Sequence, residues 1–171
     1  AFWKEAKQFN TTAFVYVGEL CRYLSFQDPS EEEKDNPISS MVGNGLRPDL
    51  WDCFRNRFNV ERIIEIYGAS EGNALFMNLL NKDETIGMTN ARVALFEYDV
   101  AEDKLVKDTE SKFIEVDEGQ PGLLLVEIGP DAIYNGYTDK KASEAKVVSN
   151  VFKEGDRWFN TGDLVKTMDV G

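Results

Sequence analysis

The first half of the chain alternates between strand-like and helix-like patterns of apolar residues. Residues 11–17 are β-branched and aromatic, as in a buried strand, whereas residues 2–9 place Phe2, Ala6 and Phe9 at the spacing of one helix face. The pattern predicts strands at 11–17, 38–42 and 62–67, and helices at 2–9, 19–26 and 49–58. Strands that alternate with helices favour a partial, mostly parallel sheet with flanking helices, because parallel pairs need crossover connections.

The pattern changes after about residue 88, where short strands follow one another closely. Gly119-Gln120-Pro121-Gly122 marks a tight turn before an apolar run at 123–128. The predicted strands are 92–99, 105–106, 113–116, 123–128, 158–159 and 164–168, with one helix at 140–152. This spacing favours an antiparallel, barrel-like, β-rich subdomain. We therefore predict an α/β fold, with an α/β part at residues 1–88 and a β-rich part at 89–171.

The charge balance excludes two classes of partner. The chain carries 31 acidic and 19 basic residues, a net charge of −12 at pH 7. Binding to nucleic acid or to an anionic membrane surface needs clustered Lys and Arg, so neither is expected. We expect the acidic excess, including the run at residues 30–35, to be solvated surface. No apolar run approaches the ~18 residues of a membrane-spanning helix, so we expect no transmembrane segment in this chain.

The residue types that the chain lacks restrict its catalytic chemistry. It has no histidine, so a Ser-His-Asp or Cys-His pair cannot form within it. Cys21 and Cys53 each lie among apolar residues in predicted helices, which favours buried free thiols over a disulfide or a zinc site. The abrupt ends and the missing initiator Met suggest an internal fragment of a longer protein.

The sharpest candidate site is Tyr67-Gly68-Ala69-Ser70-Glu71-Gly72-Asn73, directly after a predicted strand. Ligands of open α/β sheets bind beyond the carboxyl ends of strands. A glycine there lets a ligand approach the backbone, a hydroxyl can hold phosphate oxygens, and a carboxylate can hold Mg²⁺. The same letters fit the G-x-S-x-G nucleophile elbow of serine hydrolases, with Ser70 as nucleophile. An ordinary glycine turn is a third interpretation.

Two further turns gain weight from their positions. Gly43-Asn44-Gly45 follows another predicted strand, so two adjacent strands would end in glycine turns at one edge of the sheet. Such an arrangement favours a crevice. In Thr161-Gly162-Asp163, the Asp163 carboxylate can accept two hydrogen bonds from a ribose diol. An Asx-type turn in a hairpin is an alternative interpretation of this segment.

In this order the segments resemble the adenylate-forming (AMP-binding) superfamily of acyl-CoA synthetases, peptide-synthetase adenylation domains and luciferases. That superfamily has a glycine loop, a Y-G-x-[ST]-E segment, a G-x-[GL]-L turn and a T-G-D element, matched here at 43–45, 67–71, 121–124 and 161–163. A closer resemblance is to the fatty-acid-transport-protein branch, the very-long-chain acyl-CoA synthetases. Its marks are residues 16–24, 43–51, 67–73, 76–78 and 134–137, so the resemblance covers nearly the whole chain.

The resemblance implies a two-step reaction of a fatty acid with ATP and coenzyme A. The carboxylate attacks the α-phosphate of ATP to give acyl-AMP and pyrophosphate, and the CoA thiol then attacks the acyl carbon. The implied catalytic residues are Ser70 and Glu71, of which Glu71 would bind Mg²⁺. The implied nucleotide-binding residues are Gly43, Asn44, Gly45, Tyr67, Gly68 and Asp163, with Tyr67 stacked on adenine and Asp163 on the ribose. Tyr16, Gly18 and Gly68 are implied to border the acyl channel.

The resemblance also implies parts that this sequence does not contain. The phosphate loop with its lysine is expected upstream, and the lid with its catalytic lysine downstream. We therefore expect a fragment of a long- or very-long-chain fatty-acid–CoA ligase that does not complete the reaction alone. The parent is expected to be cytoplasmic, or peripheral to the cytoplasmic face of a membrane. A ligase for another carboxylic acid, a serine hydrolase and a catalytically silent folding module remain open alternatives.

Overall fold

The structure is a computed structural model that describes residues 2–68, 74–130, 132–134, 136 and 140–169. The chain divides into two compact units. One consists of Ala1–Tyr67 and Phe76–Met88, and the other of Gly68–Leu75 and Thr89–Gly171. Within the parts that the structure describes, no helix has the length and apolar character needed to cross a membrane.

The first unit is built on a four-stranded sheet in the order β1-β2-β3-β4. The pairs β1–β2 and β2–β3 are parallel, which confirms the partial parallel sheet predicted from the alternating pattern. The sheet consists of β1 (Ala13–Val17), β2 (Ser40–Asn44), β3 (Arg62–Gly68) and β4 (Leu75–Met77). The helices are α1 (Phe2–Gln8), α2 (Gly18–Ser25), the 3-10 turn η1 (Glu31–Glu33), α3 (Pro48–Asp52) and the π-helical turn η2 (Cys53–Arg57).

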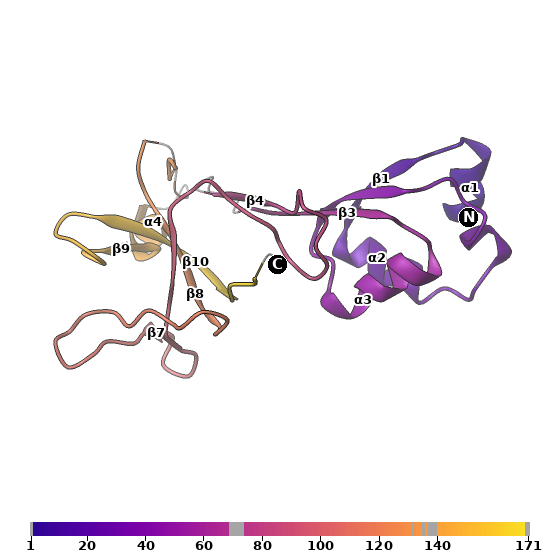
Figure 1. Cartoon of the computed structure of the whole chain (residues 1–171). Helices are drawn as coiled ribbons and strands as arrows, with labels where there is room; N and C mark the ends of the chain where they lie inside the picture. The colour runs from indigo at the N-terminus through magenta and orange to yellow at the C-terminus, as the bar shows by residue number, and fades with distance from the viewer. Residues whose placement is uncertain (1, 69–73, 131, 135, 137–139, 170–171) are drawn as a thin grey trace. The chain divides into compact units, whose positions relative to one another are not determined.

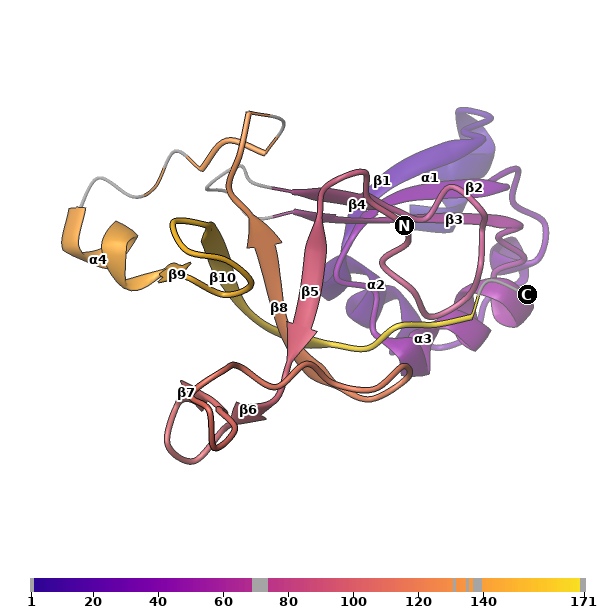
Figure 2. The same cartoon turned by 60° about the vertical axis from the view of Figure 1, so that its left-hand side comes forward.

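Helices α2 and α3 lie along one face of this sheet, as both views show (Figures 1 and 2). Strand residues that point to this face are buried with the aromatic side chains of the helices, because successive side chains of a strand point to opposite faces. The rings of Trp3 and Phe58 lie 4.4 Å apart in this core, and those of Phe54 and Phe58 lie 5.0 Å apart. On the other face, Val15 remains 76% exposed.

The acidic run at residues 30–35 is not simply solvated surface, so that expectation was wrong for Glu33. Its side chain is buried, with the residue only 3% exposed, and it pairs with Arg57 at 2.8 Å. Arg57 also donates to the carbonyl oxygens of Ser25 at 2.8 Å and Gln27 at 2.7 Å. Hydrogen bonds that satisfy the remaining donors offset the cost of desolvating such a pair. The loop after α2 is therefore fastened to the end of η2.

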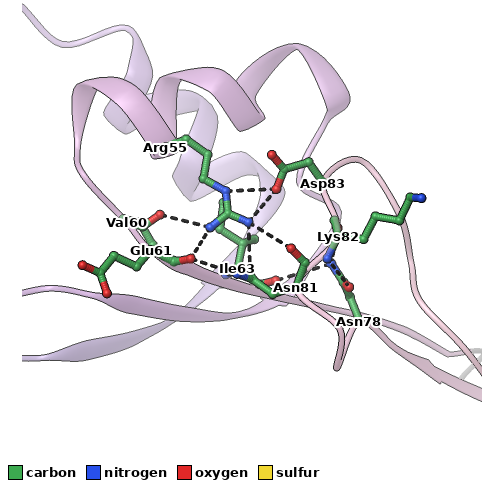
Figure 3. Close-up of polar contacts among 8 residues, drawn as sticks. All are labelled: Arg55, Val60, Glu61, Ile63, Asn78, Asn81, Lys82 and Asp83. Carbon is green, nitrogen blue, oxygen red and sulfur yellow. Dashed lines mark hydrogen bonds and ion pairs between the residues drawn. The ribbon is translucent and has the colours of Figure 1, made fainter. Parts of the chain in front are cut away.

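A second arginine fastens the segment after β4 to the start of β3 (Figure 3). The Arg55 guanidinium donates to the backbone oxygens of Val60, at 3.3 Å, and Glu61. On its other side it donates to the side chains of Asn81 at 3.0 Å and Asp83 at 2.5 Å. A guanidinium is planar and has five donors in fixed directions. The Arg55 side chain can therefore hold residues 60–61 and residues 81–83 next to each other.

The second unit contains an antiparallel sheet in the order β5-β8-β10-β9 and a small β6–β7 pair. Figure 2 shows β5 and β8 side by side in this sheet. The elements are β5 (Val93–Phe96), β6 (Tyr98–Asp99), β7 (Lys104–Leu105), β8 (Gly122–Glu127), α4 (Lys140–Ala145), β9 (Val147–Ser149) and β10 (Arg157–Val165). This confirms the predicted antiparallel, β-rich part of the fold. Strands β5 and β9 are the sheet's outer strands, so over the described residues the sheet does not close into a barrel.

Several predicted boundaries in this unit were also wrong: the strand predicted at 92–99 is divided into β5 and β6, and residues 113–116 form only isolated bridges. The helix expected at 140–152 ends at Ala145, because Val147 and Val148 pair with Phe159 and Trp158 in the antiparallel ladder. β-branched residues that meet aromatic partners across strands stabilise a sheet, and here this outweighs the helical pattern. The strand predicted to break at Asn160 instead continues as β10, with a shift of register before Leu164.

The turn before β10 is organised by Asp156, which is only 6% exposed. Its carboxylate accepts backbone N–H groups from Val151 at 2.7 Å, Phe152 at 2.9 Å and Lys153 at 3.1 Å. Burial alone would raise the pKa of Asp156, but the N–H donors outweigh it and lower the pKa. A carboxyl with a lowered folded-state pKa adds stability above its unfolded pKa, and that contribution is lost as the pH falls through the folded pKa.

We expect Asp156→Ala to lower the free energy of unfolding at pH 7 by about 1.5–3 kcal/mol, because it removes the charged acceptor of three backbone N–H groups. The difference from wild type should shrink below about pH 4. Urea denaturation at the two pH values measures it. Asp108 accepts two N–H groups in an exposed turn, so Asp108→Ala is the matched control and should cost less. Equal losses in both variants would contradict this account.

Candidate functional site

Most of the predicted site residues lie in the first unit, where three parallel strands end. The carboxyl ends of parallel strands meet at one edge of a sheet, and ligands of open α/β sheets bind beyond that edge. The strand pairings bring together there Tyr16, Gly18, Gly43, Asn44, Gly45 and Tyr67. Gly68 is the last residue of β3.

A buried hydrogen bond crosses this sheet from the first strand to the third. Tyr16 pairs in register with Gly43, which pairs with Glu65. The Tyr16 hydroxyl donates to the Glu65 carboxylate, although strands two positions apart lie about 9.6 Å from each other. A Cβ on Gly43 would lie 2.8 Å from Tyr16 Cγ and 2.0 Å from its carbonyl oxygen. Glycine therefore leaves the path open for the tyrosine ring.

The turn after β2 is held from two sides. Glu65 accepts N–H groups from Gly45 and, at 3.3 Å, from Leu46. A Cβ on Gly18 would lie 1.9 Å from the Gly45 carbonyl oxygen, so the backbones after β1 and β2 touch. Gly45 itself has a φ of +77°, a conformation that glycine adopts without strain. The side chain of Asn44 is exposed beside this fixed backbone.

Glu65 was not predicted as a site residue. It is 5% exposed, and its three donors are two amides and a phenol, none of which carries a formal charge. Burial raises the pKa of Glu65, and the hydrogen bonds from Tyr16, Gly45 and Leu46 act against that rise. The sequence signal was an acid at an inward-facing position of an otherwise apolar strand.

The nearby thiol and phenol are inert at neutral pH. Burial, followed by the charge of Glu65, raises the pKa of Cys21 to about 12. Burial and the hydrogen bond to Glu65 also raise the pKa of the Tyr16 hydroxyl. Since both groups stay protonated, Tyr16 acts here as a hydrogen-bond donor and Cys21 as a core residue.

Tyr67 lies at the end of β3 and is half-buried. Its ring meets Phe76 edge to face, with the centroids 5.6 Å apart. The backbone N–H of Asn78 donates to the Glu65 carbonyl at 2.9 Å. The Asn78 side chain donates to the Lys82 carbonyl at 2.6 Å and accepts its N–H at 3.1 Å (Figure 3). Asn78 is therefore a structural residue that closes the loop beside β3.

Asp163 belongs to the second unit, on β10, and is exposed. Its N–H donates to Thr161 Oγ1 at 3.1 Å, and the Thr161 hydroxyl donates to the Leu124 carbonyl at 3.0 Å. Gly162 N–H donates to Asn160 Oδ1 at 2.9 Å, so an Asx-type turn is present. These local hydrogen bonds explain the turn without a ligand. The ribose contact therefore remains a prediction from the sequence.

The two predicted catalytic residues, Ser70 and Glu71, lie outside the described residues. Over the ranges that are described, no group of three or more Cys, Asp or Glu side chains could hold a metal ion. Mg²⁺ needs only one or two carboxylates when substrate phosphates complete its coordination. The Mg²⁺ role of Glu71 therefore remains a prediction from the sequence.

The second unit also has a small hollow of about 200 Å³. It is lined by Tyr134, Gly136, Ser143, Glu144, Val147 and Arg157, none of which was predicted as a site residue. Ligand pockets usually measure about 300–1,000 Å³. The hollow is too small for a nucleotide or a fatty acid, so the edge of the parallel sheet is the better candidate.

Comparison with known proteins agrees with the resemblance seen in the sequence. The chain is 42% identical over 170 residues to the medium/long-chain-fatty-acid–CoA ligase FadD6 of Mycobacterium tuberculosis, matching 99% of this chain and 28% of that protein. It is 39% identical over 171 residues to long-chain fatty acid transport protein 6 of Mus musculus, matching 96% of this chain and 28% of that protein. This chain is homologous to a segment of these ligases and transport proteins. It spans about 28% of the length of these relatives.

Solved structures share the fold of this chain. The N-terminal subdomain of Klebsiella oxytoca NpsA, in complex with 3-hydroxyanthranilyl-AMSN, matches 96% of this chain and 39% of its own, with a TM-score of 0.58 and 14% identity. A benzoate CoA ligase from Burkholderia xenovorans LB400 matches 99% of this chain and 32% of its own, with a TM-score of 0.60 and 18% identity. No family model matches the chain.

Proposed function

We propose that this chain is a segment of an ATP-dependent ligase that joins long- or very-long-chain fatty acids to coenzyme A. The observation that carries the proposal is the 42% identity to a fatty-acid–CoA ligase along almost the whole chain. The sheet edge supports it, because the residues implied to contact nucleotide and acid from unit one meet there. The serine-hydrolase alternative is not favoured, since the relatives named above are ligases and transport proteins.

The reaction that follows has two steps. A carboxylate oxygen of the fatty acid attacks the α-phosphorus of ATP, and the bond from that phosphorus to pyrophosphate breaks. The CoA sulfur then attacks the acyl carbon, and the bond from that carbon to AMP breaks. The thiol proton is released, so acyl-CoA, AMP and pyrophosphate are the products. The protein contributes mainly by positioning the reactants and stabilising the phosphate charge.

The roles proposed for the chain's residues follow their places in the fold. Asn44 and the glycines beside it would line the purine, with the exposed Asn44 amide offering both donors and acceptors. Tyr67 would stack on the base, and Asp163 would hold the ribose hydroxyls. Tyr16 and Gly18, at the end of β1, would border the acyl channel together with Gly68.

The phosphates are assigned to the segment after β3. Ser70 would donate its hydroxyl to a phosphate oxygen, and Glu71 would hold Mg²⁺. The metal would neutralise phosphate charge when bound. We propose that the parent acts in the cytoplasm or at the cytoplasmic face of a membrane, where its substrates meet.

The test uses the longer polypeptide in which we propose that this segment lies. We expect it to catalyse ATP–pyrophosphate exchange that depends on a long-chain fatty acid, with benzoate or acetate giving much less exchange. The exchange reports acyl-AMP formation alone, without CoA. No exchange with any fatty acid would overturn the proposal. If benzoate or acetate drives the exchange instead, the substrate is that acid and not a long-chain fatty acid.

A second measurement addresses the hydrolase alternative. A fluorophosphonate probe labels an activated serine nucleophile. We expect no labelling at Ser70 in the same polypeptide, because a phosphate contact needs a hydroxyl and no activating base. Stoichiometric labelling of Ser70 would favour the hydrolase.

A further inference from the structure

Glu65 connects three separate backbone segments of the first unit. Its carboxylate accepts hydrogen bonds from Tyr16 on β1 and from Gly45 and Leu46 after β2. Its own carbonyl accepts the N–H of Asn78, which follows β4. One residue on β3 therefore reaches both neighbouring loops and the strand two places away.

A buried carboxylate without a charged partner is costly, and apolar residues of similar size pack a core more cheaply. Ile63, two residues earlier on the same face, shows the usual choice at such a position and is fully buried. Glu65 is therefore not explained by core packing. Its acceptor oxygens are explained by the N–H groups of Gly45 and Leu46, because the N–H of the buried Leu46 needs an acceptor within the protein.

Gly43 and Asn44 are the last residues of β2 and pair with β1, whereas Gly45 lies just beyond the ladder, beside the backbone of Gly18. Gly45 is in the left-handed region and its neighbours Gly43 and Asn44 leave no large side chain to pack. Glycine gives the backbone more freedom than any other residue. The Glu65 hydrogen bonds restrict that freedom, and the exposed Asn44 side chain is displayed from the fixed backbone.

We propose that Glu65 is a positioning residue, which holds the Gly43–Gly45 turn in the conformation that receives the nucleotide. The proposal rests on the function proposed above, which assigns this turn to the purine. Glu65 touches no substrate and acts through the turn and through Tyr16. Its effect should therefore fall on binding of ATP more than on the rate of the chemical step.

The first test uses the 171-residue chain and needs no activity. Hydrogen exchange of the Gly45 and Leu46 amides is compared between wild type and Glu65→Gln, which keeps the size of the side chain. We expect exchange at both amides to become about tenfold faster in the variant. Glu33→Gln is the matched control, because Glu33 is also a buried carboxylate of this unit, and it should leave these two amides unchanged. Unchanged exchange in Glu65→Gln would overturn the proposal.

The second test measures kinetics in the longer polypeptide. Glu65→Gln should raise the apparent KM for ATP in pyrophosphate exchange about tenfold, with a smaller change in kcat. Glu33→Gln should lower the melting temperature and leave the KM within about twofold of wild type. A lower melting temperature with an unchanged KM in Glu65→Gln would make Glu65 a merely structural residue. No exchange in the wild type would instead overturn the proposed function and the nucleotide role, while the amide exchange still decides whether Glu65 holds the turn.

Discussion

Replacement of Glu71 by glutamine is expected to lower fatty-acid-dependent ATP–pyrophosphate exchange by about 10²-fold or more. The sequence places this acid one residue after a hydroxyl and just beyond the buried strand β3. Glutamine keeps the size of the side chain and one carbonyl oxygen but removes the charge. If the carboxylate holds Mg²⁺ against the phosphates, the loss falls on the transition state, where charge on the phosphate is greatest. The measurement is the exchange rate of the longer polypeptide at saturating Mg²⁺.

Glu61→Gln is the control for this prediction. Glu61 is an exposed acid just before β3, and its backbone carbonyl, not its carboxylate, accepts from Arg55 and Asn81. Its loss should leave the exchange rate near wild type. If a folded Glu71→Gln protein exchanges pyrophosphate at nearly the normal rate, the metal role assigned to Glu71 is wrong.

The parallel strands β1, β2 and β3 could be predicted because each is a short apolar run that ends in a polar or glycine turn, whereas β4 was not predicted. The pattern at residues 62–67 was sufficient to predict β3, and the observed strand is longer than the predicted one only by Gly68. The glycine turn after β2 was also predicted, since glycines between an apolar run and a helix indicate a turn. The position of a glycine in the sequence indicates where the backbone turns. It does not show that the backbones of Gly18 and Gly45 contact each other in the fold.

What could not be predicted depends on pairing between distant strands. The helix predicted at 140–152 has a helical pattern of its own, and only the partners of Val147 and Val148 on β10 make the second part a strand. Glu65 was missed for the same reason. Alternation along β3 gives its face, but its role follows from the register that aligns it with Gly43 and Tyr16. The sequence alone does not show which residues of neighbouring strands pair, so it does not show that Glu65 is aligned with Gly43 and Tyr16.

In the longer polypeptide, Asp163→Ala is expected to raise the apparent KM for ATP about 10- to 100-fold and to leave the KM for fatty acid nearly unchanged. A carboxylate that accepts two hydrogen bonds from a ribose diol contributes about 1.5–3 kcal/mol, which corresponds to that range. Tyr67→Ala should act in the same direction, because a stacked base contributes about 1–3 kcal/mol. Kinetics with each substrate varied in turn measure both constants.

The alternative for Asp163 is that it only shapes the turn in β10, and the structure supplies the control for it. The turn is held by Thr161, whose hydroxyl accepts the Asp163 N–H and donates to the Leu124 carbonyl, whereas the Asp163 carboxylate is exposed. Thr161→Val should therefore lower the melting temperature more than Asp163→Ala does. If Asp163→Ala melts like wild type, binds ATP normally and handles the fatty acid poorly, the ribose assignment is wrong. The assignment of the sheet edge to the nucleotide would then rest on Tyr67 and the Gly43–Gly45 turn alone.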